Sequence, residues 1–228
     1  KRMADAIGDI PKGAASAQST HDAIPGTPEK GIQVTSRVSV NPEAGRIEVD
    51  LLDNADQMNC GLNVSESCTR TAAYIGVFNS IDPTVPRNSG SFRRVRLHLK
   101  DGAVVGRPKF PHSCSVATTN VADRLINITQ AAFAQIGEGW GLAEGGVGMG
   151  AGFAVISGAD HRANDEPYVN QLIVTSSGGP GGPVADGWVT YAVPVVGGLM
   201  YRDSIEIDEL KHPMEFRYLR DRKSTRLN

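Results

Sequence analysis

The sequence predicts an α+β fold in which mixed β-sheet layers are combined with two amphipathic helices and glycine-rich loops. Three observations support this prediction. Apolar and polar residues alternate in several short segments, apolar residues recur at helical spacing in two longer ones, and glycines are concentrated in the second half of the chain. With 228 residues, the chain is long enough to bury a substantial hydrophobic core.

Two β-hairpins are predicted in the first half of the chain. In residues 32–40 and 47–51, apolar residues occupy every second position, and the Asn-Pro-Glu-Ala-Gly between them supplies turn residues. A second hairpin is predicted over residues 93–105. There, Asp101 and Gly102 separate two strand-like segments, and an Asp-Gly pair readily adopts positive φ.

The first amphipathic helix is predicted over residues 62–81. Asn63 or Ser65 can cap its start, and the Asp82-Pro83 pair stops it. Its apolar face is formed by Val64, Cys68, Ala72, Ile75 and Phe78.

The second amphipathic helix follows Asn120, which can cap it. Asp123 favours the positive N-terminal end of a helix, and Gly137 can close the other end. Its apolar positions are Val121, Leu125, Ile128, Ala132 and Ile136.

The remainder of the chain is predicted to contain loops and short strands. Residues 137–152 are glycine-rich, which is typical of a tightly turning loop. Apolar strands are predicted over residues 152–156, 169–176, 187–193 and 204–207.

Charge and composition exclude two classes of partner. A net charge of −2 argues against a general nucleic-acid or membrane-surface binder, and the apolar runs are too short and too broken by glycine and proline to span a bilayer. The three cysteines, Cys60, Cys68 and Cys114, show no CxxC spacing, which fits a reduced, cytoplasmic protein.

No metal site is predicted within this chain, because its five histidines form no HxH or HxxxH pair. On a strand, His112 and Cys114 would share a face, so a Cys–His pair is geometrically feasible. A structural cysteine is the favoured interpretation. Residues 176–183 could offer backbone N–H groups to an anion but lack a P-loop ending, and residues 141–152 are a weak GxGxxG candidate because no helix start follows them. Both are interpreted as turns.

Two polar segments are candidates for binding. Asn88 and the following residues suit a turn that would present Arg93 at the mouth of a strand, where its guanidinium could hold a carboxylate or phosphoryl group. Solvated or paired strand arginines explain this segment equally well. Asp203, Glu206 and their acidic neighbours could shift a pKa or recruit a cation, although a charged edge strand is the favoured interpretation.

Three segments together resemble a known family. They are VDLLDNADQMNCGLNVSESCTRTAA (residues 49–73), PRNSGSFRRVRLHLKDGAVVGRP (86–108) and PHSCSVATTNVADRLINITQAAFAQIG (111–137). In this order and spacing they resemble the hydantoinase B/oxoprolinase family, and the similarity extends over residues 1–220. The chain is therefore expected to form part of a hydantoinase B-type domain that lacks its true beginning, with residues 221–228 as a non-native tail.

The resemblance implies a component of an ATP-dependent hydrolase that opens cyclic amides such as hydantoins or 5-oxoproline. A separate A-type subunit would use ATP to phosphorylate the ring amide oxygen, so a hetero-oligomer is expected. Mg²⁺ or Mn²⁺ would be held by a part of the domain upstream of Lys1, and neither ATP nor metal by this chain. A large subunit of an acetone- or acetophenone-type carboxylase and a non-catalytic assembly scaffold stay open as alternatives.

The resemblance also implies candidate substrate-binding positions, although it assigns no catalytic residue. These positions are Asn88, Gly90, Arg93, Thr119, Asn120, Asp123, Asp203 and Glu206.

Overall fold

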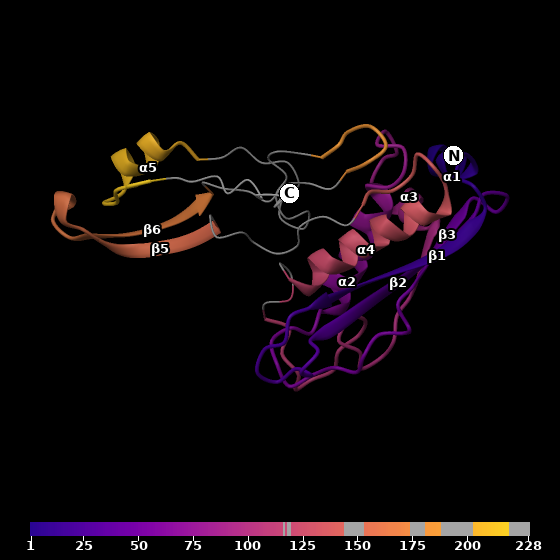
Figure 1. Cartoon of the computed structure of the whole chain (residues 1–228), viewed down its shortest axis with the longest axis horizontal. Helices are drawn as coiled ribbons and strands as arrows, with labels where there is room; N and C mark the ends of the chain where they lie inside the picture. The colour runs from indigo at the N-terminus through magenta and orange to yellow at the C-terminus, as the bar shows by residue number, and fades with distance from the viewer. Residues whose placement is uncertain (116, 118–119, 144–152, 174–180, 188–202, 219–228) are drawn as a thin grey trace, which may run out of the picture. The chain divides into compact units, whose positions relative to one another are not determined.

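A four-stranded sheet with the order β1-β2-β3-β4 is the base of the computed structural model (Figure 1). Its strands are β1 (Gly13–His21), β2 (Ile32–Asn41), β3 (Arg46–Asp50) and β4 (Val95–His98). β2 pairs antiparallel with both β1 and β3, whereas β4 joins β3 in parallel. The structure describes residues 1–115, 117, 120–143, 153–173, 181–187 and 203–218.

The first predicted hairpin is confirmed. β2 and β3 pair with Val40 opposite Ile47 and Val38 opposite Val49, and all four side chains are buried on one face. The alternation pattern does not predict β1, because its apolar residues are only glycine and alanine. β1 nevertheless pairs along β2 from Gly13 to His21, so the neighbouring strand determines its conformation.

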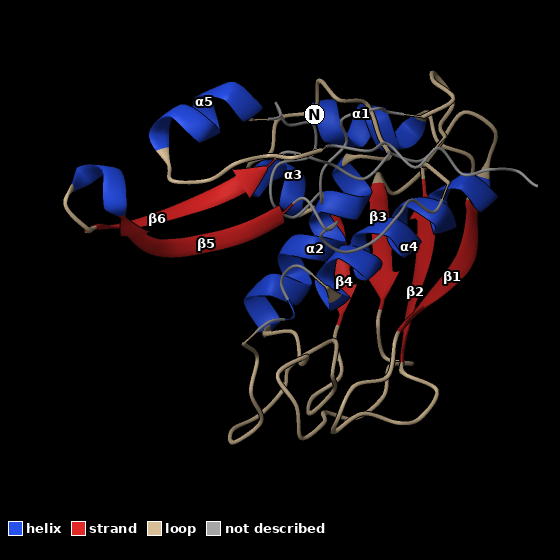
Figure 2. Ribbon diagram, turned by 60° about the vertical axis from the view of Figure 1, so that its left-hand side comes forward, coloured by secondary structure: helices blue, strands red, loops and turns tan. Residues whose placement is uncertain are grey.

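Helices α2 (Glu66–Phe78) and α4 (Val121–Ile136) cover the apolar face of the sheet (Figure 2). α4 packs on β1, β2 and α2. A polar contact fastens it to the sheet, because the hydroxyl oxygens of Ser36 in β2 and Thr129 in α4 lie 3.0 Å apart, both fully buried. Two short helices, α1 (Arg2–Gly8) and α3 (Ser89–Phe92), complete this part of the fold.

Both predicted amphipathic helices are confirmed, and α2 is shorter than expected. Ser65 caps α2 by accepting a hydrogen bond from the Cys68 N–H, and the helix ends at Phe78, before the Asp82-Pro83 pair. Its buried face is also rotated from the predicted one, because Cys68 and Ile75 are only half-buried. The residues that α2 buries are Thr69, Ala72, Ala73, Gly76, Val77 and Phe78.

The predicted hairpin over residues 93–105 is wrong. β4 pairs with β3, while Val104 bonds to the loop before α2, donating to Ala55 O at 2.9 Å and accepting from Val64 N at 2.8 Å. Gly102 has a positive φ of 70°, but Asp101 does not, so no two-residue hairpin turn forms. The reason is burial: residues 103–105 are all fully buried, which a strand with one solvated face cannot achieve.

A second compact unit is formed by Gly150–Ser176 and Tyr201–Asn228, distinct from the unit of Lys1–Met149 and Ser177–Met200. It contains the antiparallel strands β5 (Phe153–Asp160) and β6 (Glu166–Ile173), which confirm two predicted strands, and helix α5 (Ile205–Lys211). The predicted strand over residues 204–207 is wrong. Glu206 and Asp208 stand in the first turn of α5, where the helix dipole favours negative charge.

Two expectations lie outside the described residues: most of the predicted strand over residues 187–193, and the expected tail over residues 221–228. Among the residues that the structure does describe, no helix combines the length and the apolar character that a membrane span requires.

The contact between α2 and α4 depends on the absence of a side chain at Gly76. A Cβ atom there would lie 2.6 Å from Thr129 Cβ and 2.8 Å from its Cγ2. Alanine adds about 1 kcal/mol of helix propensity, while overpacking a core costs about 1–3 kcal/mol. We therefore expect Gly76→Ala to lower the free energy of unfolding by up to about 2 kcal/mol in denaturant titrations.

Gly8→Ala is the matched control, because no atom lies within 4 Å of a Cβ at that helical position. Its unfolding free energy should equal or exceed that of the wild type. Adding Thr129→Ser to Gly76→Ala should recover part of the loss, since it removes Cγ2 and keeps the hydroxyl bonded to Ser36. A Gly76→Ala variant as stable as Gly8→Ala would contradict this account of the helix crossing.

Candidate functional site

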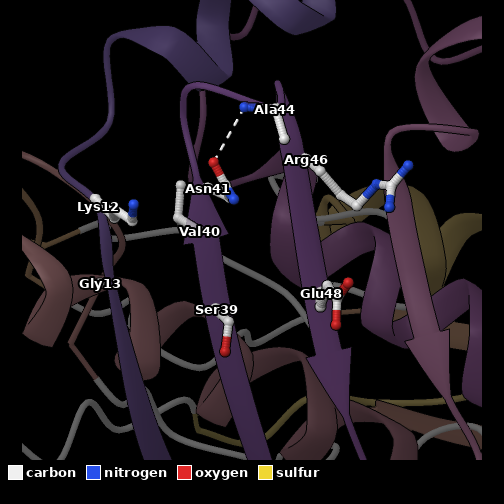
Figure 3. A pocket seen from close by; sticks show the side chains of 8 residues that line it. All are labelled: Lys12, Gly13, Ser39, Val40, Asn41, Ala44, Arg46 and Glu48. Carbon is white, nitrogen blue, oxygen red and sulfur yellow. Dashed lines mark hydrogen bonds between the residues drawn. The ribbon is translucent and has the colours of Figure 1, made fainter.

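A shallow cavity of about 460 Å³ lies where β1, β2 and β3 approach the β2–β3 turn (Figure 3). Its charged groups largely have partners: Lys12 Nζ lies 3.1 Å from Glu43, and Glu48 lies 3.0 Å from His98 Nε2. Its lining combines two cations with a carboxylate and contains no aromatic ring, so it favours no particular ligand. It is lined by Lys12, Gly13, Ser39, Val40, Asn41, Ala44, Arg46 and Glu48.

A second cavity, of about 430 Å³, lies between α2 and α3 and combines aromatic rings with arginines. We call it the α2–α3 groove. The Phe92 ring meets Tyr74 at a centroid distance of 4.8 Å and meets Phe78 edge-on at 5.5 Å. The groove is lined by Ser67, Arg70, Thr71, Tyr74, Ile75, Phe78, Arg87 and Phe92.

Local sequence places these side chains together. Arg70, Tyr74 and Phe78 are four residues apart along α2, so they form one stripe on the helix. Asn88 caps the start of α3, because its Oδ1 accepts hydrogen bonds from the N–H groups of Gly90 and Ser91. This cap sets the short helix that presents Phe92 to the stripe.

An ion-pair network holds Arg70 at the groove. Its Nε and Nη2 donate to Glu66 Oε1 at 2.8 and 2.6 Å, and Arg107 Nε lies 3.2 Å from the same oxygen. The hydrogen bond from Arg70, and then that from Arg107, hold the pKa of the Glu66 carboxyl below its usual range. Glu66 thus stays ionised and keeps Arg70 in place over a wide pH range.

The residues predicted from the turn at Asn88 have mainly structural contacts. Asn88 is the α3 cap, and Arg93 is an exposed residue at the end of that helix whose Nε donates to Ser89 O at 3.2 Å. Gly90 is exposed within the same turn. In place of the predicted turn, this segment forms the short helix α3 before β4, and Ser91 within it is buried.

The predicted residues around α4 lie at the other end of the sheet. Asn120 stands at the N-cap position of α4 and Asp123 is buried in its first turn, while Thr119 lies outside the described residues. Arg124 Nη1 donates to Ser19 Oγ, near the end of β1, whereas Arg94 Nη1 reaches Ala44 O in the β2–β3 turn.

These two contacts separate the candidates. Ser19, the partner of Arg124, lies opposite Val34 near the start of β2. Ala44, the partner of Arg94, lies in the β2–β3 turn beyond Val40 at the other end of that strand. The distance between those positions along β2 is about 20 Å. Asn88 and Arg93 therefore do not share a site with Asn120 and Asp123.

Asp203 and Glu206 belong to the second unit and stabilise its backbone. Asp203 exchanges two hydrogen bonds with Ile173, through its N–H at 2.9 Å and through Oδ2, which accepts from the Ile173 N–H at 2.6 Å. Glu206 accepts from the Ser204 hydroxyl at 2.7 Å, which lowers the pKa of its carboxyl. The interpretation of this acidic cluster as an edge strand is wrong, since α5 contains most of it.

His112 and Cys114 do not form the pair that a strand would allow. They lie in an irregular segment, and His112 Nδ1 instead bonds to Gln57 Nε2 at 2.8 Å. Burial raises the pKa values of the Cys68 and Cys114 thiols, which keeps them protonated and weakens them as nucleophiles. All three cysteines are free thiols, as a structural role requires.

The described part of the chain contains no group of three or more His, Cys, Asp or Glu side chains that could hold a metal ion. Most of the glycine-rich candidates over residues 141–152 and 176–183 lies outside it. Sequence reasoning missed the α2–α3 groove. The four-residue spacing of Tyr74 and Phe78 was available as a signal, but the partner ring of Phe92 comes from a separate helix.

The Glu66 network predicts a measurable titration. Its contribution to stability is present above the ordinary glutamate pKa and is lost as the pH falls through the lowered pKa of the folded state. A carbon-13 NMR titration of the Glu66 carboxyl should therefore show a midpoint below the ordinary value for a glutamate side chain. Arg70→Gln should raise this midpoint more than Arg107→Gln does; an ordinary midpoint in the wild type would contradict the network.

Comparison with known proteins gives consistent matches. A family model, hydantoinase B/oxoprolinase, matches residues 1–225. The solved structure of an ATP-dependent caprolactamase from Pseudomonas jessenii has a TM-score of 0.67 at 21% identity, over 93% of this chain and 36% of that one. Acetone carboxylase in a nucleotide-free state has a TM-score of 0.64 at 13% identity, over 90% of this chain and 28% of that one. Curated protein sequences give no match.

These matches carry different weight. At such identities, the two structures share the fold with this chain, and the chain spans about a third of their length. The family model, in contrast, covers nearly the whole sequence and agrees with the resemblance seen in its motifs. This chain belongs to the hydantoinase B/oxoprolinase family.

Proposed function

We propose that this chain is a component of an ATP-dependent cyclic-amide hydrolase that opens hydantoin or 5-oxoproline rings. The observation that carries the proposal is the match of the hydantoinase B/oxoprolinase family model to residues 1–225. The shared fold with an ATP-dependent caprolactamase supports it, because caprolactam is itself a cyclic amide.

The chemistry requires two functions. An unactivated lactam is a poor electrophile, so an A-type partner subunit would use ATP to phosphorylate the ring amide oxygen and create a leaving group. The component proposed here would then hold the activated ring, stabilise developing negative charge and direct a water molecule to the ring carbon. We assign ATP to the partner. The described residues contain no group of side chains that could hold a metal ion, so we assign any Mg²⁺ or Mn²⁺ to another part of the protein.

Within this chain, Asn88 and Arg93 are the proposed contacts to substrate. Arg93 is exposed and its Nε donates to Ser89 O, while its terminal nitrogens form no hydrogen bond with any described residue. A guanidinium so placed can bind a phosphoryl or carboxylate oxygen pair. The three free thiols support a cytoplasmic location for the hetero-oligomer that we propose.

A carboxylase is the second candidate. Acetone carboxylase shares the fold over 90% of this chain, so the scaffold is compatible with carboxylation of a ketone as well as with ring opening. A third candidate, a region that only assembles subunits, is favoured by the separation of the predicted site residues at opposite ends of the sheet.

The reaction is tested with the protein that carries this chain, combined with an A-type subunit, ATP and Mg²⁺ or Mn²⁺. We expect ADP and ring-opened product to rise together from 5-oxoproline or a hydantoin, and only with both subunits present. Turnover that requires bicarbonate and a ketone would replace the hydrolase by the carboxylase. ADP and product are followed by chromatography in the same samples.

Arg93→Ala distinguishes a site from a scaffold. We expect at least a tenfold loss of kcat/KM with the subunits still co-eluting in size-exclusion chromatography, since one charge-assisted hydrogen bond to a phosphoryl group contributes about 1.5–3 kcal/mol. Arg96→Ala, an exposed arginine three residues further on, is the matched control and should retain turnover. Loss of co-elution in Arg93→Ala would instead support the scaffold.

A further inference from the structure

We propose that the α2–α3 groove is a binding site for an amphipathic anion, a carboxylate or phosphoester carried on an apolar or aromatic body. The proposal is independent of the cyclic-amide hydrolase reaction. It follows from the shape, the apolar floor and the charge of the groove.

The floor of the groove is suited to a flat apolar group. Tyr74 and Phe92 are tilted by 34° at a centroid distance of 4.8 Å, and Phe78 meets Phe92 edge-on. Aromatic rings stack favourably on a further ring or bury an aliphatic chain. A volume of about 430 Å³ falls within the range of small-molecule sites, roughly 300–1,000 Å³.

The rim of the groove is positive. Its lining includes Arg70 and Arg87 and no carboxylate. Glu66 accepts hydrogen bonds from Arg70 Nε and Nη2, which holds that guanidinium in position, and Nη1 forms no hydrogen bond with any described residue. Arg87 forms no hydrogen bond or ion pair with any residue in the described part of the chain, so its planar fork is available to a carboxylate or phosphate.

Packing of α3 on α2 does not account for this arrangement by itself. Packing would bring Phe92 against Tyr74 and Phe78, but it requires neither an open volume beside them nor two arginines around it. The cavity at the sheet end provides a comparison, because its lining includes a carboxylate, Glu48, beside Lys12 and Arg46, and no aromatic ring. The α2–α3 groove has aromatic walls and an unbalanced charge, which together specify an anion with an apolar body.

The test is a titration of the chain with four probes, followed by amide chemical shifts in proton–nitrogen NMR. Phenylphosphate and benzoate present both recognition elements, phenol presents only the ring, and inorganic phosphate presents only the charge. We expect at least one of the first two to bind at least tenfold more tightly than phenol and inorganic phosphate, with shifts at Ser67, Thr71 and Tyr74. The stronger of the two identifies the phosphoester or the carboxylate as the preferred anion.

Three variants locate the binding. Arg87→Gln should weaken it at least fivefold, and Ser67→Glu, which introduces a carboxylate at an exposed lining position, should weaken it at least as much. Tyr74→Leu should reduce the preference for phenylphosphate over inorganic phosphate. Arg96→Gln is the matched control, an exposed arginine on β4 outside the groove, and should bind like the wild type.

Two results would overturn the proposal. One is the absence of saturable binding by both ring-bearing anions to the folded chain. The other is binding that Arg87→Gln and Ser67→Glu leave unchanged. Circular dichroism spectra and thermal transitions of each variant show whether it is folded. If Tyr74→Leu unfolds, Ser67→Glu still tests the proposal, because Ser67 is exposed and contributes no side chain to the core.

Discussion

The close crossing of α2 and α4 over the sheet is the constraint on which the rest of the structure depends. Gly76 lets α2 approach Thr129, and Thr129 in turn contacts Ser36 in β2, so helix, helix and strand are joined through one position. Thr129 also donates to Leu125 O within its own helix, which orients the hydroxyl toward the sheet. The arrangement is buried throughout, so any added volume there must displace backbone.

This crossing also determines which side of α2 is available for binding. The small residues Ala72, Ala73 and Gly76 form the part of α2 that faces the core, beside the buried Val77 and Phe78. Arg70, Tyr74 and Ile75 are only half-buried, and the separate ring of Phe92 comes to lie beside them. The core contact and the α2–α3 groove are thus two consequences of the same helix orientation.

Membership of the hydantoinase B/oxoprolinase family describes the chain as a whole, whereas the positions of the candidate residues show which of them could share a site. The family match concerns the whole chain, whereas the residues suggested by resemblance are divided between the two ends of one sheet and a second unit. Several of them stabilise local backbone, as Asn88 does for α3 and Asp203 does for β6. A polar residue in a family-like position can therefore serve the fold, whereas Arg93 is exposed and its terminal guanidinium nitrogens are available.

The sequence by itself determined the β2–β3 hairpin, the two long helices and the family. In each case the information is local, since alternation along Ile32–Asn41 and the helical period along Val121–Ile136 need no distant partner to be recognised. The three apolar residues at 103–105 show no such period, and the alternation over 204–207 is too short to distinguish a strand from the first turn of a helix, so the prediction fails for both segments.

Only the tertiary structure decided the parallel pairing of β4 with β3, the strand character of β1 and the location of the groove. β1 has almost no apolar pattern and is ordered by pairing with β2, while the groove requires Tyr74 and Phe92 from different helices. The separation of Arg93 from Asp123 likewise depends on the direction in which α4 crosses the sheet. These features arise from contacts between residues far apart in the chain, which a pattern within one segment cannot encode.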